Sequence, residues 1–191
     1  MVSVLGLGMI ATHGASVLLL VDASDPSFVT FTTTGDPPLI NDSSATTFDG
    51  VTLLGFFNLP AAGHGSMMGN LTPHGATVSF DSWGTSDYSG TPVDVSLYHS
   101  ILPAKAQDFA TDAPAFTGMG YALGMPLGNV AVPGSVGDII AGWYMSGEGH
   151  GGDLRVIGQW QVVPEPSTLA WALVAPMGAV LLRSCQKWSK T

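Results

Sequence analysis

Histidine and methionine are the residues of this chain whose types could bind a soft transition metal. No two histidines follow the HxH or HxxxH spacing that aims two rings at one ion. His64 and His74 are flanked by Gly and Pro and are predicted to lie in loops. We therefore expect no metal site, and instead surface histidines and core methionines. The residues concerned are His64, His74, His99 and His150, with Met67, Met68, Met119, Met125 and Met145.

The residue pattern gives little support for a catalytic nucleophile. Ser66, in Gly63-His64-Gly65-Ser66-Met67, lacks the downstream glycine of a nucleophile elbow. The one cysteine, Cys185, lies beyond the last apolar segment, so the body can form no internal disulfide. The segment from Glu148 to Asp153 is the densest set of acid and base groups, and its glycines predict a solvated hairpin tip. We expect no enzyme, no catalytic residue and no resident cofactor.

Calcium is the one ion that the acidic residues could bind, because calcium takes hard oxygen ligands. No twelve-residue calcium loop of the known pattern occurs, so the alternative of a solvated acidic surface stays open. The closely spaced acid pairs are Asp22 with Asp25, Asp81 with Asp87, and Asp108 with Asp112.

Aromatic residues offer the most plausible binding surface in the body. Trp83 and Tyr88 lie close in sequence and near Asp residues, and exposed rings of this kind could stack on sugars. They are candidate contacts for a glycan. Trp143 and Trp160 fall in predicted strands and are expected in the core.

Composition favours strands over helices and excludes a nucleic-acid partner. The 191 residues include 5 Lys and Arg against 14 Asp and Glu, a formal charge of −9 that repels phosphate backbones. Charged residues make up 10% of the chain, against about 25% in an ordinary soluble domain. Exposed helix faces are usually filled by these scarce residues, whereas the 25 Gly and 13 Pro punctuate turns.

Residues 16–161 form a succession of short β-type runs separated by Gly, Pro, Asp, Asn and Ser. Strict alternation, as in Val93-Asp94-Val95-Ser96-Leu97, predicts one buried and one wet face. We expect one all-β domain, an antiparallel, jelly-roll-like β-sandwich that ends in a hairpin, with a helical turn allowed at Pro103 to Pro114. The predicted strands are Ser16 to Val21, Phe28 to Thr34, Gly50 to Phe57, Ala76 to Phe80, Val93 to His99, Gly120 to Leu123, Asp138 to Met145 and Leu154 to Val162.

The first fifteen residues are apolar and small, and they resemble the end of a secretory signal peptide. The segment lacks the Lys or Arg that opens such a signal, which suggests a truncated signal. The alternative is a buried amino-terminal strand.

After Trp160 the chain changes character. Two prolines flank one acid in Val163-Pro164-Glu165-Pro166-Ser167-Thr168, which favours extended backbone and ends the β domain. Residues 169–182 contain no charge and predict a single hydrophobic helix of about 21 Å, shorter than the roughly 30 Å bilayer core. Pro176 would kink this helix, so a temporary anchor is favoured. The anchor side chains are Leu169, Trp171, Leu173, Val174, Val180, Leu181 and Leu182, and the basic stop that follows is Arg183, Lys187 and Lys190.

This order of motif, apolar helix and basic end resembles the PEP-CTERM sorting signal of Gram-negative bacteria. Pro164, Glu165 and Pro166 match the family's namesake triplet, and Ser167 and Thr168 match its usual followers. The resemblance covers residues 163–191 only. The departures are Pro176 and a tail in which uncharged residues interrupt the basic run.

The resemblance implies export through the secretory translocon and transient retention in the inner membrane. It also implies processing by an exosortase-type membrane peptidase and delivery to the cell surface or matrix. We therefore expect a non-enzymatic surface or biofilm-matrix component. The alternatives are a secreted glycan-binding module or hydrolase, and a protein that stays anchored on the periplasmic face.

Overall fold

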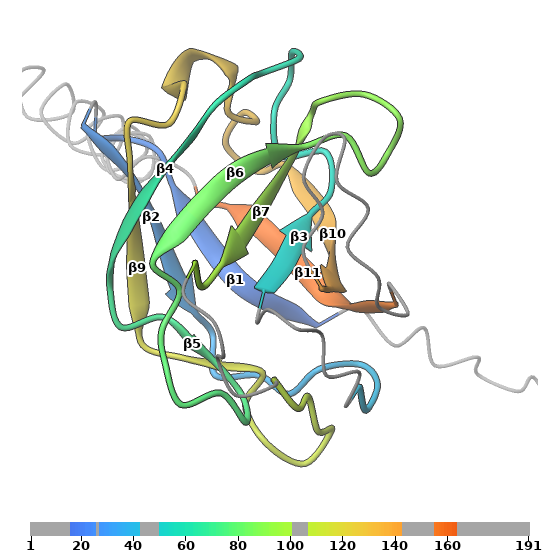
Figure 1. Cartoon of the computed structure of the whole chain (residues 1–191). Helices are drawn as coiled ribbons and strands as arrows, with labels where there is room; N and C mark the ends of the chain where they lie inside the picture. Colours follow the sequence, from blue (N-terminus) through green and yellow to red (C-terminus); the bar gives the residue numbers. More distant parts are fainter. Residues whose placement is uncertain (1–15, 26, 43–49, 101–106, 143–154, 164–191) are drawn as a thin grey trace, which may run out of the picture.

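The computed structural model describes residues 16–25, 27–42, 50–100, 107–142 and 155–163. Nine strands close into one barrel, in the order β1-β11-β10-β3-β7-β6-β4-β9-β2 (Figure 1). A second sheet of two short strands, β5 and β8, lies beside it. The strands are β1 (Val17–Asp22), β2 (Phe28–Thr33), β3 (Gly50–Leu53), β4 (His64–Gly69), β5 (Thr72–Pro73), β6 (Ser82–Ser86), β7 (Asp94–Tyr98), β8 (Phe116–Thr117), β9 (Met119–Leu123), β10 (Val136–Ala141) and β11 (Val156–Val162).

The all-β prediction is confirmed, whereas the two-sheet sandwich is not. β1 pairs antiparallel with β2 on one side and parallel with β11 on the other. The first and last strands therefore close the sheet on itself, which leaves no separate second layer. Alternation along a strand cannot distinguish the two architectures, because both turn one face of a strand toward the core. The other face is buried as well along β3 and most of β7.

Seven of the eight predicted strands overlap strands of the described chain, and β10 pairs antiparallel with β11 as the predicted final hairpin requires. Ala76 to Phe80 is not a strand, although Phe80 is buried. The prediction missed β4, β5, β6 and β8, whose sequences are short or rich in Gly, Ser and Met. These residues carry little of the β-branched signal on which strand prediction depends.

Helical structure in the described ranges is limited to the 3₁₀ turn η1 (Leu127–Asn129). Residues 107–114 contain no helix, and the rest of the segment from Pro103 falls outside the described residues. No helix within the described ranges is long and apolar enough to cross a membrane. The predicted helix 169–182 and the predicted signal segment 1–15 lie outside those ranges.

Two tryptophans and a group of phenylalanines form the core of the barrel. The Phe56 ring lies 5.8 Å from Phe31 and 5.4 Å from Trp160, centroid to centroid. Each indole N–H donates to a main-chain carbonyl: Trp83 to Leu123 at 2.9 Å and Trp160 to Leu54 at 3.1 Å. These bonds satisfy the only polar atom of each ring, so both side chains can be buried without an orphaned donor.

Buried polar side chains tie the strands to the loops around the core. The Asp94 carboxylate, fully buried, accepts the backbone N–H groups of Gly55 and Ser89, each at 2.8 Å. Gln107 makes two bonds to the backbone of Gly50, accepting at 3.0 Å and donating at 2.7 Å. The loops that carry Gly55, Ser89 and Gln107 are therefore held to fixed positions on the barrel.

Candidate functional site

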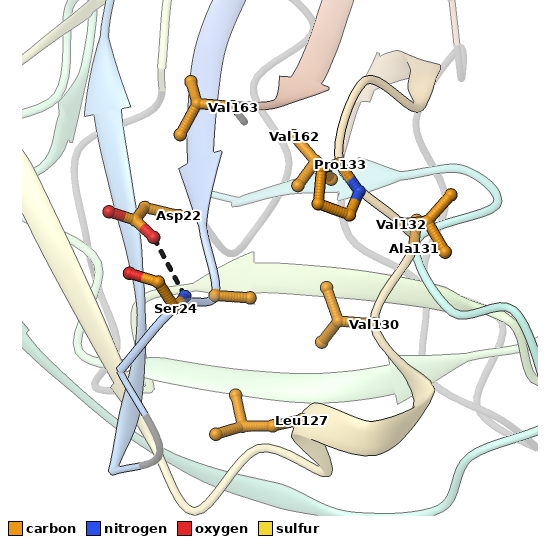
Figure 2. Close-up of a pocket in the computed structure, with 10 residues that line it drawn as sticks. Asp22, Ser24, Leu127, Val130, Ala131, Val132, Pro133, Val162 and Val163 are labelled. Carbon is orange, nitrogen blue, oxygen red and sulfur yellow. Dashed lines mark hydrogen bonds between the residues drawn. The ribbon is translucent and has the colours of Figure 1, made fainter. Parts of the chain in front are cut away.

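A small pocket lies where the last barrel strand ends. It has a cavity volume of about 170 Å³ and lies between the end of β1, the segment from η1 to Pro133, and the end of β11 (Figure 2). Its polar groups come from Asp22 and Ser24, and Asp22 Oδ1 accepts the backbone N–H of Ser24 at 2.9 Å. Most of the remaining wall is apolar: Leu127, Val130, Val132, Pro133, Val162 and Val163.

Hydrogen bonds hold the end of β11 against this pocket. Val162 donates to the carbonyl of Ser135 at 2.9 Å, and the Val162 carbonyl accepts the N–H of Gly134 at 2.9 Å. Val163 donates to the carbonyl of Val21 at 2.8 Å. The next residue, Pro164, has no N–H to donate to a neighbouring strand. Val163, the first residue of the predicted sorting motif, is thus held to β1, and the rest of the motif lies outside the described residues.

The pocket is too small for an ordinary substrate. Ligand pockets usually measure about 300 to 1,000 Å³, roughly two to six times this volume. Its lining provides one carboxylate and one hydroxyl, without a histidine or cysteine beside them. A single side chain of a partner would fill the pocket. Acid–base or nucleophilic chemistry would need a second catalytic group, such as a histidine, beside the carboxylate or the hydroxyl.

A second cluster of polar groups joins the start of β6 to the end of β7. The Asp81 carboxylate accepts the Ser100 N–H at 2.8 Å and the Ser100 hydroxyl at 3.0 Å. His99 Nδ1 lies 3.0 Å from Asp81 Oδ2. Ser100 therefore donates to the carboxylate and not to the imidazole, so the three residues do not form a nucleophile–base pair.

The same cluster shifts the pKa of two groups. Burial raises the pKa of Asp81, but hydrogen bonds from Ser100 and Ser82 and the neighbouring His99 outweigh burial and hold that pKa below its ordinary value of 3.8. Burial, and then the Asp81 charge, raise the pKa of the Tyr98 phenol. These shifts mark Asp81 as an ionised carboxylate that holds the ends of the two strands together.

The structure separates one of the predicted acid pairs. Asp81 and Asp87 flank opposite ends of β6, about 20 Å apart along an extended strand. Asp22 and Asp25 each accept a backbone N–H two residues ahead. Within the described ranges no group of three or more His, Cys, Asp or Glu is placed to hold a metal ion.

The predicted loop position was wrong for His64 and confirmed for His74. His64 and Ser66 are exposed residues of β4, which pairs with both β6 and β9. His74 is half-buried in the turn just after β5, where its Nδ1 contacts the Asp108 carbonyl. His150 and the loop from Glu148 to Asp153 fall outside the part of the chain that the structure describes.

The prediction of core methionines is confirmed for Met67 and Met125, which are buried, and was wrong for Met68 and Met119, which are 60% and 37% exposed. Successive side chains of a strand point to opposite faces, so Met68 points away from the core that Met67 enters. Met145 lies outside the described residues.

The aromatic surface predicted from Trp83 and Tyr88 needs correction. Trp83 is 1% exposed, because alternation along β6 turns its ring into the barrel, where its N–H reaches Leu123. Tyr88, in the loop after β6, is 39% exposed, so its role as a sugar contact stays a prediction. Trp160 is buried as expected, and Trp143 lies outside the described residues.

Sequence reasoning missed a half-buried aromatic pair elsewhere. Phe28 and Tyr121 meet edge to face, with ring centroids 5.4 Å apart and planes at 88°. The signal was present in Met119-Gly120-Tyr121-Ala122-Leu123, where large side chains alternate with small ones. An alternation of this kind turns one set of side chains outward, and the small residues here turn inward.

Comparison with known proteins gives no match: no protein-family model, no curated protein and no solved structure matches this chain.

Proposed function

We propose that this chain is an exported, non-enzymatic component of the cell surface or extracellular matrix, delivered by a removable carboxyl-terminal sorting segment. The basis is the PEP-CTERM-like order of Pro164-Glu165-Pro166, the apolar stretch 169–182 and the basic end at Arg183, Lys187 and Lys190. The secretory translocon, the inner membrane and an exosortase-type peptidase are the partners that this order implies. Extracellular polysaccharide is a further partner at the destination.

One structural observation carries the proposal. Val163, the last described residue, bonds to the carbonyl of Val21, and Pro164-Glu165-Pro166 follows it directly in the sequence. A peptidase acts on extended backbone, and Pro164 and Pro166 favour extended conformations at themselves and at the residues before them. Cleavage after Val163 would remove none of the barrel hydrogen bonds described above, so the body would be released folded.

The experiment replaces the motif in a strain that contains the processing enzyme. Pro164→Ala, Glu165→Ala and Pro166→Ala together are expected to leave the protein full-length and in the membrane fraction, while the wild type becomes shorter and leaves the membrane. The matched control replaces an acid and a proline in an exposed loop of the body, Asp36→Ala with Pro37→Ala, and should be processed like the wild type.

Two results would count against the proposal. Processing of the triple variant at wild-type efficiency would show that the motif is not read. A wild-type chain that stays full-length in the membrane would favour the permanent anchor.

A further inference from the structure

Three loops lie at the end of the barrel where β11 ends. β3, β6 and β9 run in the same direction as β11, because an even number of antiparallel pairings separates each of them from it. The loops that follow these strands, 54–63, 87–93 and 124–135, therefore gather at one end of the barrel. Figure 1 shows this end at the top of the view, opposite the small sheet labelled β5. We name the three loops, together with Val163, the exit end.

Backbone hydrogen bonds join the three loops to one another. The N–H of Phe57 donates to the carbonyl of Val93 at 2.8 Å, and the N–H of Asn58 donates to the carbonyl of Asn129 at 2.7 Å. The loop 54–63 is therefore bonded to both of the other loops. The loop 124–135 is in turn held to β11 by the two backbone bonds of Val162 described above. The exit end is thus one connected surface at the place where the chain leaves the barrel.

Each of the three loops exposes one large side chain. Leu59 and Val132 are each 60% exposed, and Tyr88 is 39% exposed. The apolar surface continues from Val132 through Pro133 to Val163, which line the pocket beside β11 (Figure 2). The exit end therefore presents apolar and aromatic side chains to solvent next to the last residue of the barrel.

Charge is distributed unequally between the two ends of the barrel. Loops 54–63 and 124–135 contain no Asp, Glu, Lys, Arg or His. The exposed carboxylates of the described residues all lie at the opposite end, in segments 34–42 and 107–115; they are Asp36, Asp108 and Asp112. The carboxylates at the exit end are half-buried or buried; they are Asp22, Asp25, Asp87 and Asp94. The opposite end therefore favours water, whereas the exit end can approach an apolar medium at a lower desolvation cost.

The sequence after Val163 sets how far the exit end can lie from a membrane. Residues 164–168 separate Val163 from the apolar stretch 169–182. A chain spans at most about 3.6 Å per residue, so the six peptide units from Val163 to Leu169 cover at most about 22 Å. While the stretch lies in a bilayer, Val163 stays within that reach of it. The opposite end is farther away by the length of a strand, about 20 Å for the six residues of β2.

We propose that the exit end docks on the lipid bilayer while the carboxyl-terminal segment holds the chain there, with Leu59, Tyr88 and Val132 in the interfacial region. The inference rests on the proposed function, because it requires residues 169–182 to act as a membrane anchor. Leu and Val side chains partition into the boundary between headgroups and acyl chains, and a Tyr ring sits at the level of the headgroups. The exposed carboxylates at the opposite end point away from the lipid phosphates.

Docking of this kind depends on the anchor. Three side chains bury no more apolar surface than one fatty-acyl chain, which by itself gives only marginal, reversible membrane binding. The anchor keeps the exit end close to the bilayer, so the contact forms at a high effective concentration. Removal of the carboxyl-terminal segment therefore ends both attachments, and the released barrel does not stay on the membrane.

Fluorescence quenching of the full chain in nanodiscs tests the proposal. The chain carries Cys185→Ser and a dye on one introduced cysteine, either Val132→Cys at the exit end or Leu39→Cys at the opposite end, where Leu39 is 41% exposed. Each phosphatidylcholine disc holds one chain, which excludes contact with a second copy, and part of the lipid carries a nitroxide near its headgroup. The dye at position 132 should be quenched at least about twofold more strongly than the dye at position 39, because docked side chains enter the interface by about 5 to 10 Å.

A second substitution separates docking from the proximity that the anchor alone provides. Leu59→Glu places a charge in the interfacial region and should lower the quenching of the dye at position 132 to the level of the dye at position 39. Leu39→Glu is the matched control and should leave the quenching at position 132 unchanged. Thermal unfolding checks the fold of each variant, and Tyr88→Glu replaces Leu59→Glu if the latter is unfolded.

The remaining outcomes overturn the proposal in distinguishable ways. Equal quenching of the two dyes in discs that retain the chain would overturn docking and leave the anchor in place. Strong quenching at position 132 that survives Leu59→Glu would also overturn docking, because the length of the tether would then explain it. A chain that separates from the discs would overturn both docking and the membrane anchor on which it rests.

Discussion

Val163 donates its backbone N–H to the carbonyl oxygen of Val21 at 2.8 Å, and this bond is the last one that ties β11 to β1 before Pro164. The predicted Pro-Glu-Pro triplet begins at the next residue. Within β11, Gln159, Trp160 and Gln161 are paired with β1 on one side and with β10 on the other.

A chain that ends at Val163 is expected to fold as the full chain does. Its thermal unfolding should be cooperative, with a midpoint within about 2 °C of the full-length value, because the barrel hydrogen bonds of the described residues are retained. A chain that ends at Gly158 loses Trp160, the largest core residue of β11, and the pairing of that strand's second half. It should show no cooperative transition by circular dichroism. Equal behaviour of the two truncations would contradict the boundary.

A substitution at Gly137 tests how closely β10 approaches the loop after β3. A Cβ there would lie 2.6 Å from the Trp160 ring and would also contact the Leu54 carbonyl, which accepts the indole N–H. Gly137→Ala should therefore lower the free energy of unfolding by about 2 kcal/mol, the cost of an overpacked core. Gly128→Ala is the matched control, because a Cβ at Gly128 meets nothing within 4 Å. Its effect should stay below about 1 kcal/mol in denaturant titrations. Similar losses for both would show that Gly137 is not close-packed.

Parts of this fold follow from local sequence patterns and other parts do not. Alternation in Val93 to Leu97 correctly predicted the strand β7, and the strand limits of β1 and β11 were close. The predicted solvent-exposed face of β7 was wrong, because Asp94 and Ser96 are both buried. The parallel pairing of β1 with β11 was missed because alternation reveals which residues are buried and not which strand lies alongside. Trp83 was misplaced because its burial depends on the Leu123 carbonyl, forty residues away in sequence. The sorting segment stays a prediction; its parts are adjacent along the chain, so it could be proposed from the sequence alone.

Because of Asp81, the stability of the barrel is expected to change with pH in the acid range. Its pKa is lowered in the folded protein, so the carboxylate stabilises the fold above the ordinary pKa of 3.8, and this contribution is lost as the pH falls through the folded value. Asp81→Asn should therefore reduce stability near neutral pH, and its difference from wild type should shrink at pH values below about 4. Ser100→Ala removes one of the bonds to the carboxylate and should weaken the same pH dependence. A constant difference across this range would contradict the assignment.

Tyr98 provides an independent readout of the same cluster. Burial and the Asp81 charge raise the pKa of its phenol above 10.0. Asp81→Asn should therefore move the phenolate absorbance transition of Tyr98 to lower pH, because the repelling charge is gone. An unchanged transition would mean that the two groups are not coupled.

Mass spectrometry of the native protein tests the central claim most directly. Recovered from the cell surface or the medium, the protein should retain the barrel through Val163 and lack the peptide that contains Arg183 and Lys187. Recovery from the cytosol as a chain that still ends at Thr191 would contradict export and removal of the carboxyl-terminal segment.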